Sequence, residues 1–437
     1  MADWMALARK LEYVEPVSAH GLISRITGLM VEADGPRVSV GRYCHILSQS
    51  GEIPAEVVGF RGSKTLLMPL GELEGVAPGD KVIPQKQKLT VGVGSMLLGR
   101  ILDGLGHPID GKEVSFQEYY SLHNSPPNAL FRPRINDPLN VGVRVIDGML
   151  TLGRGQRMGI FAGSGVGKST LLGMMARNTE ADVNVIALVG ERGRELRDFM
   201  EKDLGAEGLA RSVIVVATSD QPALVRLKAA FTATAIAEYF RDKGNNVLFM
   251  MDSVTRFAMA QREIGLTIGE PPATRGYPPS VFALLPKLLE RVGMSEKGSI
   301  TGVYSVLVDG DDHNEPIADA VRGILDGHAV LSRELASKNH YPSIDVLQSV
   351  SRLMTDVANP EIQALAGRIR EHLAIYQDAK DLIDIGAYVE GSNSKIDEAI
   401  KHIDKIKAFL CQDIDENSSY EKMLTSMKKV FEGAEAS

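Results

Sequence analysis

The stretch that decides the fold reads FAGSGVGKST, Phe161 to Thr170, and lies between the apolar run MGIFA and the helical pattern STLLGMMA. A glycine-rich turn that follows a buried strand and opens a helix can cradle a phosphate, because backbone N–H groups and the positive helix end converge on an anion. The strict form of this motif has glycine at position 162, where this chain has Ala162. A plain strand-to-helix turn is the alternative, but the Gly-Lys-Ser core in this context favours a phosphate site.

The loop supplies both backbone amides and a positive charge. We predict that Gly163, Gly165 and Gly167 turn successive N–H groups inward to form an anion nest. Lys168 then places its charge on the terminal phosphates, and the hydroxyl of Ser169 is a candidate ligand of Mg²⁺. The predicted nucleotide-binding residues of the loop are Gly163, Ser164, Gly165, Val166, Gly167, Lys168, Ser169 and Thr170.

Apolar runs alternate with helical patterns on either side of this loop, from Gly155 to about Leu307. The runs read MGIFA, VNVIALV, SVIVVA, NVLFMM and GVYSVLV. Continuous apolar strands between helices are typical of a sheet that is buried on both faces and is therefore mostly parallel. The sequence thus predicts an α/β core.

The flanking regions have different patterns. Residues 19–85 contain short β-branched runs separated by DGP, SQSG and PGD, which predict a small β-barrel, with an irregular region as the alternative. Residues 110–147 carry several prolines and few periodic apolar residues, so we expect a connector. After Arg352 the strand signals stop and helical spacing continues, which predicts a helical domain over 353–437 and leaves 86–352 for the α/β domain.

The N-terminal segment, residues 1–18, has an amphipathic helical pattern. Trp4, Leu7 and Leu11 of MADWMALARKLE share one helical face. Docking onto a partner and packing on the protein's own domain are both open interpretations.

Two acidic residues follow core strands. Asp252 ends the run NVLFMM, where a carboxylate suits a magnesium site better than the alternative of a helix cap. Glu191 follows the run ALVG and is the candidate that polarises the attacking water. Its neighbours Arg192, Arg194 and Glu195 could instead form solvated surface charge.

Composition narrows the class of protein. The 437 residues are 44% hydrophobic with a net charge of -8, which does not favour binding to nucleic acid or anionic membranes through bulk charge. Cys44 and Cys411 lie far apart, so neither a disulfide framework nor a zinc site is predicted. Because no apolar run reaches the ~18 residues that span a bilayer, we expect a cytoplasmic protein.

Together these residues resemble the rotary ATP synthase catalytic subunits and their secretion relatives, over nearly the whole chain. GERGRE is similar to the segment that carries the family's catalytic carboxylate, which implies this role for Glu191 and a place in the magnesium-water shell for Glu195. PSIDVLQSVS, residues 342–351, fits the family signature, and Arg352 after it matches the arginine finger that reaches a neighbour's nucleotide. Tyr341 matches the aromatic residue that packs on adenine, with an ordinary core tyrosine as the alternative.

Within the family, the stretches PPATRGYPPSVFALLPKLLERVG, GDDHNEPIADAVRGILDGHAVLSR and DIGAYVEGSNSKIDEAI look most like the flagellar branch of the type III export ATPases, and injectisome ATPases are very similar. The resemblance implies a RecA-like core that binds ATP and Mg²⁺ in a homohexamer, with PPATRGYPP around a central hole for a coiled-coil stalk protein. It also implies a stator-like regulator at the N-terminus, a membrane export gate, chaperone–substrate complexes as partners, and a peripheral location at the inner face of the cell membrane.

Two rival functions differ in class. A nucleic-acid motor of the transcription-terminator type shares the core fold, but the acidic balance and the lack of an aromatic-basic platform argue against a nucleic-acid partner. A nucleotide-binding structural subunit without turnover should have lost the glutamate at position 191, which this chain retains.

Overall fold

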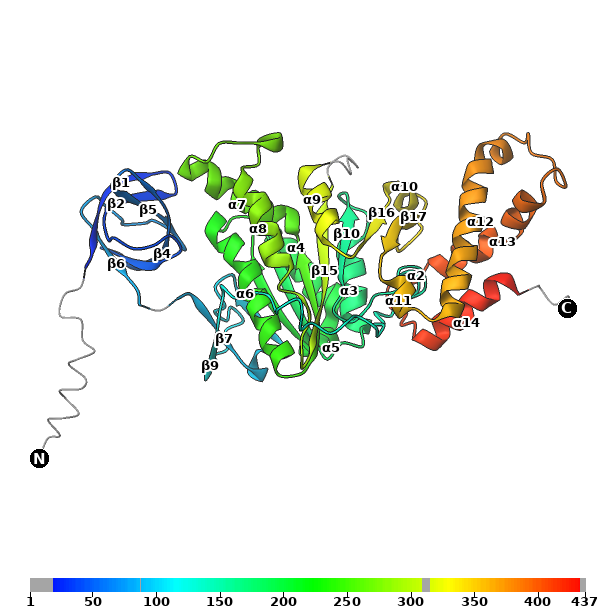
Figure 1. The fold of residues 1–437 in the computed structure, drawn as a ribbon, viewed down its shortest axis with the longest axis horizontal. Helices are drawn as coiled ribbons and strands as arrows, with labels where there is room; N and C mark the ends of the chain where they lie inside the picture. The colour runs from blue at the N-terminus through cyan, green and yellow to red at the C-terminus, as the bar shows by residue number, and fades with distance from the viewer. Residues whose placement is uncertain (1–18, 87, 309–314, 433–437) are drawn as a thin grey trace, which may run out of the picture. The chain divides into compact units, whose positions relative to one another are not determined.

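The computed structural model describes residues 19–86, 88–308 and 315–432. The predicted partner-docking segment 1–18 and most of the run GDDHNEP therefore lie outside the described residues. The chain divides into two compact units, one built chiefly from residues up to Thr90 and one that holds most of the remainder. Figure 1 shows the order of the elements along the chain, and each unit is described by itself.

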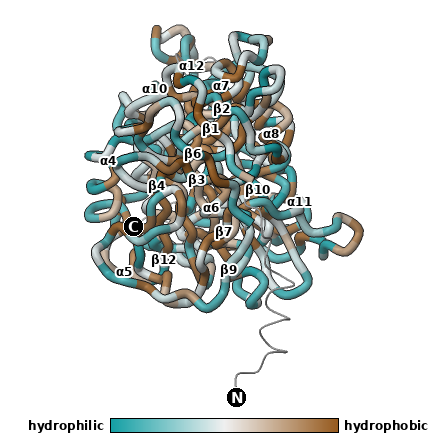
Figure 2. Tube along the Cα trace, turned by 90° about the vertical axis from the view of Figure 1, so that its left-hand side faces the viewer, coloured by the Kyte–Doolittle hydropathy of each residue, from teal (hydrophilic) through white to brown (hydrophobic). Residues whose placement is uncertain are grey.

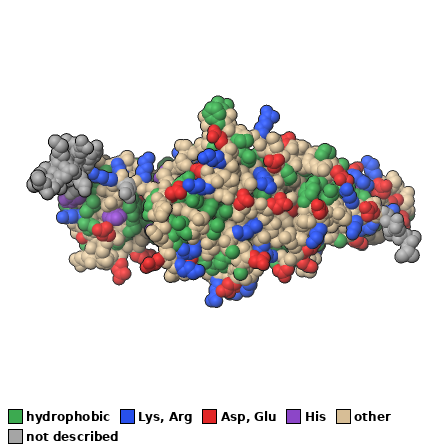
Figure 3. Space-filling model, turned by 90° about the horizontal axis from the view of Figure 1, so that it is seen from below, with side chains coloured by type: hydrophobic (Ala, Val, Ile, Leu, Met, Phe, Trp, Pro, Cys, Tyr) green, Lys and Arg blue, Asp and Glu red, His purple; other side chains and the backbone are tan. Residues whose placement is uncertain are grey.

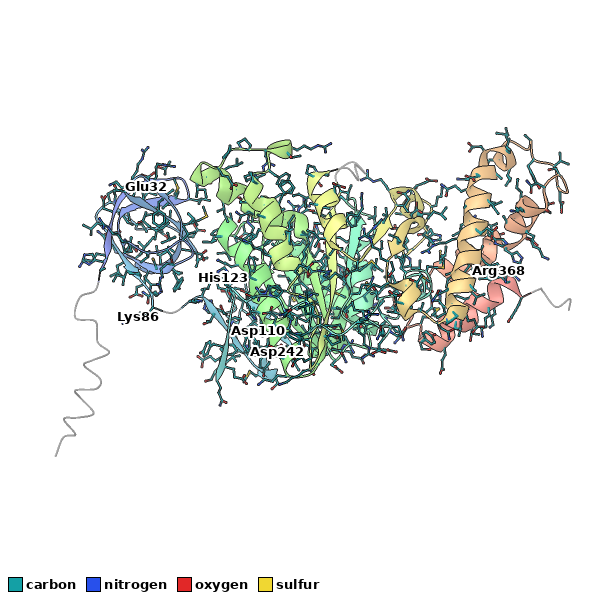
Figure 4. The ribbon with its side chains drawn as sticks, viewed as in Figure 1. Glu32, Lys86, Asp110, His123, Asp242 and Arg368 are labelled. Atoms are coloured by element: carbon teal, nitrogen blue, oxygen red, sulfur yellow. The ribbon has the colours of Figure 1, made fainter. Side chains whose placement is uncertain are left out.

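The first unit is a closed six-stranded antiparallel barrel, which confirms the predicted β-barrel. The strands follow one another around the barrel in the order β1-β2-β5-β4-β3-β6, and Gly21 of β1 pairs with Val82 of β6 to close it. Alternate apolar side chains such as Ile46 point inward and are fully buried. Glu32 of β2, labelled in Figure 4, forms an ion pair of 2.6 Å with Arg61 of β4, across the intervening strand β5. The strands are β1 (Gly21–Thr27), β2 (Met30–Asp34), β3 (Tyr43–Ser48), β4 (Gly51–Arg61), β5 (Lys64–Pro69) and β6 (Lys81–Pro84).

The second unit contains a nine-stranded sheet in the order β17-β16-β10-β15-β13-β11-β12-β8, with β14 paired to β15. All its pairs are parallel except β16 with β17 and β14 with β15, so the predicted mostly parallel sheet is confirmed. The five predicted apolar runs form five of these strands, whereas β8, β14, β16 and β17 were not predicted. The strands are β8 (Arg100–Asp103), β10 (Arg157–Ala162), β11 (Val183–Val189), β12 (Ser212–Ala217), β13 (Asn246–Asp252), β14 (Gly293–Met294), β15 (Ser299–Leu307), β16 (Gly327–Leu331) and β17 (Ile344–Ser351).

Helices cover both faces of this sheet, as the burial of β11 and β12 along their whole lengths requires. Figure 1 shows α6 and α8 on one side of the strands and α3 on the other. The short helix α4 has no buried residue, and its trace is largely hydrophilic in Figure 2. The helices are α3 (Lys168–Asn178), α4 (Gly193–Asp198), α5 (Gly205–Ala210), α6 (Ala223–Asp242), α7 (Val254–Ile268), α8 (Pro279–Leu289), α9 (Pro316–Ile324) and α10 (Arg333–Ser337).

The predicted connector over residues 110–147 is more structured than its sequence suggests. It contains β9 (Glu118–Ser121), which forms a two-stranded sheet with β7 (Thr90–Val93), and it ends in α2 (Arg144–Met149). The buried guanidinium of Arg291 donates to the Leu122 carbonyl at 2.7 Å and to the buried carboxylate of Glu238. The buried Arg291–Glu238 ion pair therefore holds the connector against the core. No local sequence pattern predicts this contact.

The C-terminal part is helical, as predicted. After α11 (Met354–Val357), three helices pack together: α12 (Pro360–Asp384), α13 (Ser394–Leu410) and α14 (Tyr420–Phe431). Arg368, labelled in Figure 4, lies 3.8 Å from the centre of the Phe431 ring. Arg144 of α2 joins these helices to the core, because its side chain donates to the Phe409 carbonyl at 3.2 Å and also contacts Glu416.

The surface carries charges of both signs. On the face shown in Figure 3, acidic and basic side chains are interspersed, which agrees with the modest net charge of -8. None of the helices in the described ranges is long and apolar enough to cross a membrane.

Candidate nucleotide-binding and catalytic site

The glycine-rich loop lies between β10 and α3, at the carboxyl edge of the sheet. Gly165 and Gly167 have φ angles of 76° and 88°, a left-handed conformation that glycine adopts at no steric cost. Gly163 does not have a positive φ, so two of the three predicted positions need glycine for backbone reasons. Ala162 is still part of β10, where it pairs with Leu307 and Leu331. An extended strand position accepts alanine, which explains how the loop forms without the glycine of the strict motif.

Lys168 and two carboxylates meet in front of this loop. Asp252 is the last residue of β13, pairs in register with Leu188 of β11, and is 4% exposed. Lys168 Nζ donates to Asp252 Oδ1, and the hydroxyl of Ser305 donates to the same oxygen at 2.6 Å. Glu191 Oε1 lies 3.7 Å from Lys168 Nζ. Parallel strands end at one edge, so residues far apart in sequence converge beside the phosphate loop.

Glu191 has an environment suited to accepting a proton. Burial, and then the charge of Asp252, raise the pKa of Glu191 to about 7, while Lys168 opposes the shift. Its Oε1 is buried and has no hydrogen-bond partner. A general base works best when its pKa is close to the operating pH, so this carboxyl is matched to activating water near neutrality.

The residues predicted to serve magnesium are placed differently. Ser169 is exposed at the start of α3, next to Lys168. Glu195 lies on α4 and its carboxylate is 3.7 Å from the exposed Arg192, so these two side chains are at the surface. Across the described residues, no cluster of three or more His, Cys, Asp or Glu side chains could hold a metal alone. The hydroxyl of Ser169 and the buried carboxylate of Asp252 fit Mg²⁺, because this ion usually keeps waters and phosphate oxygens as its other ligands.

Tyr341 lies against the phosphate loop. A Cβ atom added to Gly167 would be 3.4 Å from the Tyr341 ring, and the tyrosine is 39% exposed. The backbone N–H of Gln412, just after α13, donates to the Tyr341 carbonyl at 2.9 Å. The ring is thus half open to solvent beside the loop, rather than part of the core.

Arg256 is a further residue of this region that was not predicted from the sequence. Its side chain packs on Gly190, where an added Cβ would lie 2.9 Å from the Cβ of Arg256. Its Nε is buried without a hydrogen-bond partner. An unsatisfied guanidinium nitrogen beside the strand end that carries Glu191 suits a developing negative charge. The only signal in the sequence is an arginine four positions after Asp252.

Arg352 does not join this group within one chain. β17 runs antiparallel to β16, so Ile344 pairs with Leu331 at the edge of the phosphate loop, and Ser351 pairs with Gly327 at the opposite edge. Arg352 is exposed there, and its guanidinium donates to the Arg322 carbonyl at 3.4 Å. Within the described part of the chain, it pairs with no carboxylate.

The loop PPATRGYPP is anchored near its C-terminal end, where Tyr277 and Pro278 are buried. Tyr277 is 4% exposed, and the guanidinium of Arg262 lies 5.2 Å from the centre of its ring. Arg275 has a φ of 47° within the short turn Thr274–Gly276, which is an unusual conformation for a residue other than glycine.

Comparison with known families agrees with the fold. The model of the ATP synthase alpha/beta family, nucleotide-binding domain, matches residues 142–351. The beta-barrel domain model of the same family matches residues 23–85, and the T3SS EscN ATPase C-terminal domain model matches residues 358–429. The chain is therefore a P-loop ATPase of the ATP synthase alpha/beta family.

Sequence identity to individual proteins places the chain in a narrower group within this family. The chain is 57% identical to the flagellum-specific ATP synthase of Bacillus subtilis, over 95% of this chain and 96% of that one. It is 51% identical to a type 3 secretion system ATPase of Xanthomonas euvesicatoria, over 98% of both chains. The assembled ATPase EscN from the enteropathogenic E. coli type III secretion system matches with a TM-score of 0.90 and 47% identity, over 94% of this chain and 99% of that one. EscN in complex with its central stalk EscO matches with a TM-score of 0.87 and the same identity and coverage. Within its family, the chain belongs to the flagellar and type III secretion ATPases.

Proposed function

We propose that the chain hydrolyses ATP, as its magnesium complex, to power the export of flagellar proteins through a type III export apparatus. The observation that carries the proposal is the position of Lys168 between Asp252 and Glu191, at the mouth of a glycine-rich loop. The 57% identity to a flagellum-specific ATP synthase supports the biological role.

Each residue of the site has a separate task in this proposal. The loop amides hold the phosphates, and Lys168 exchanges Asp252 for phosphate oxygens when the nucleotide binds. Ser169 and the released Asp252 would then hold Mg²⁺, which neutralises charge on the phosphates, with Glu195 contacting its waters. Glu191 accepts a hydrogen bond from the attacking water and takes up its proton.

The proposed site is completed by one residue of the same chain, Tyr341, and by one residue of a second subunit, Arg352. Tyr341 packs on the adenine ring beside the loop of its own chain. Arg352 lies at the opposite edge of the sheet, so it serves the nucleotide of a neighbouring copy, where its charge stabilises the transferring phosphoryl group. A homohexamer provides such neighbours around a ring, and the assembled state of EscN supports this assembly.

The proposed partners follow from the relatives. The complex of EscN with its central stalk EscO supports a stalk protein that is surrounded by the loop PPATRGYPP. We extend the proposal to a stator-like regulator at residues 1–18, a membrane export gate, chaperone–substrate complexes, and a peripheral position at the inner face of the cell membrane. No nucleic acid takes part.

Complementation tests the biological role. The chain is expressed in Bacillus subtilis that lacks its own flagellum-specific ATP synthase, and swimming and flagellin export are measured. We expect partial or full recovery with the wild-type chain, and none with Lys168→Ala at equal expression. Absence of recovery by a chain that hydrolyses ATP in vitro would argue against the flagellar assignment.

An injectisome ATPase is the second candidate. It is favoured by the 51% identity to a type 3 secretion system ATPase and by the match of the C-terminal helices to the EscN model. Binding to purified gate components of a flagellar and of an injectisome system, compared side by side, separates the two roles.

A further inference from the structure

Ser343, the residue immediately before β17, contacts the phosphate loop directly. Ser343 is fully buried, and its hydroxyl donates to the backbone carbonyl of Val166 at 2.7 Å, across 177 positions of sequence. Val166 is the residue before Gly167, and its own side chain is 1% exposed. A buried side chain from the far end of the sheet therefore holds one peptide of the loop.

The geometry of a peptide bond links this contact to phosphate binding. The carbonyl of Val166 and the N–H of Gly167 belong to one planar trans peptide, so the two groups point in opposite directions. A hydrogen bond that holds the carbonyl on the protein side turns the N–H toward the inside of the loop. Gly167 itself, with a φ of 88°, has no side chain to restrict the rotation of this peptide.

The position of Ser343 is well fixed. Its own carbonyl accepts a hydrogen bond from the N–H of Ser332 at 2.8 Å, which ties it to the end of β16. The ring of Tyr341, two residues before Ser343 in the sequence, lies against Gly167. The segment that leads into β17 thus contacts the loop at two successive residues, Val166 and Gly167.

We propose that Ser343 is a positioning residue for the phosphate loop, and that its hydroxyl orients the Val166–Gly167 peptide so that the Gly167 N–H faces the nucleotide phosphates. This inference rests on the proposed function, because the loop must bind a nucleotide phosphate. It assigns a task to the serine in the second position of PSIDVLQSVS.

Ser343→Ala tests the proposal, and Ser349→Ala is its matched control. Ser349 lies in β17, the strand that follows Ser343, and is 6% exposed. Its hydroxyl donates to the Asp345 carbonyl at 2.5 Å and accepts from the N–H of Val330 at 2.9 Å. The control therefore removes a buried hydroxyl six residues further along the chain, at a position that does not contact the loop. Ser343→Thr keeps the hydroxyl, and Ser343→Cys keeps the size with a weaker donor.

We expect Ser343→Ala to raise KM for ATP and Kd for Mg·ADP by about five- to tenfold, the effect of one orienting hydrogen bond, with kcat within about twofold of wild type. Ser349→Ala should leave both constants unchanged, and Ser343→Thr should restore them. If Ser343→Ala does not fold, the comparison of Ser343→Cys with Ser343→Thr replaces it, and Cys alone should weaken binding.

Two results would overturn the inference: unchanged nucleotide affinity in Ser343→Ala, or an equal loss in Ser349→Ala, which would show a general effect of strand stability. Direct binding of Mg·ADP makes this test independent of turnover. A wild-type chain that binds Mg·ADP without hydrolysing ATP would refute the proposed function and leave the test of Ser343 intact.

Discussion

The two edges of the central sheet, at the carboxyl ends of the parallel strands and at their opposite ends, hold different numbers of the candidate site residues. At the carboxyl edge, Lys168 of the loop contacts the buried Asp252 and lies 3.7 Å from Glu191, all within one chain. At the opposite edge, Arg352 is exposed and has no acidic partner in the described chain. The four residue steps of β16 from Gly327 to Leu331 separate the two levels by about 13 Å, at roughly 3.3 Å per step. One chain therefore brings the phosphate loop and both carboxylates together, whereas Arg352 can act on a nucleotide, as we propose, only in a neighbouring copy.

Among the variants that test this difference between the two edges, removal of Arg352 is expected to cause the largest loss of kcat. Arg352→Ala should bind ATP but lose ~10³-fold or more in kcat, because an arginine finger stabilises charge only in the transition state. ATPase rates and nucleotide binding are measured on the same preparation. Weakened binding with normal kcat would place Arg352 outside the reaction.

Mixed rings sharpen the same prediction. Arg352→Ala subunits are mixed with Glu191→Gln subunits, so that some interfaces pair an intact Glu191 with an intact Arg352. These interfaces should regain activity, with a maximum at equal amounts of the two subunits and none at either pure mutant, once subunit exchange has been verified independently. Activity that stays at the single-mutant level in proven mixed rings would show that the site is not shared.

Glu191→Gln tests the candidate site at the carboxyl edge of the sheet. It should bind Mg·ATP nearly normally and lose turnover by ~10²-fold or more, the range expected for a general base. Loss of nucleotide binding as well would make Glu191 a structural residue, and kcat close to wild type would end its assignment as the base.

The pH dependence of kcat/KM depends on the raised pKa of Glu191. A base must be deprotonated to act, so with a pKa of about 7 the rate should rise with pH through neutrality and level off above it. At one pH unit below the pKa about one tenth of the groups are ionised, which predicts a roughly tenfold lower rate near pH 6 than on the plateau. A profile that is flat from pH 6 to 8 would contradict this assignment. The residual activity of Glu191→Gln should lack this dependence.

The smallest effect is expected from Ser351→Ala, at the exposed edge. The hydroxyl of Ser351 donates to the Thr151 carbonyl at 3.1 Å and accepts from Gln156 at 3.0 Å, which holds the end of β17 before Arg352. Loss of these bonds should lower kcat by about three- to tenfold with unchanged ADP affinity, the reverse of the pattern expected for Ser343→Ala. If Ser351→Ala changed ADP affinity instead, the two ends of β17 would not act on separate sites.

Much of the fold could be predicted from local patterns. Five strands of the sheet are continuous apolar runs, and the barrel and the C-terminal helices have the periodicities of their secondary structures. β8, β14 and β16 were missed because they are short. β17 was missed because a bulge between its residues Asp345 and Val350, opposite His328 and Val330 of β16, breaks the alternation of buried residues. Arg256 was missed because its relevance depends on packing against Gly190, 66 positions away in the sequence.

The sequence by itself determined the phosphate loop, its lysine, the two acidic residues after core strands and the three kinds of domain, because each depends on a short pattern with a local physical cause. Only the tertiary structure decided that Lys168 contacts Asp252 and lies close to Glu191, that Ser343 holds the loop, and that Arg352 faces away from its own chain's site. These features follow from the order and register of strands in the sheet. Register is set by the packing of the whole sheet, and no single stretch of sequence contains it.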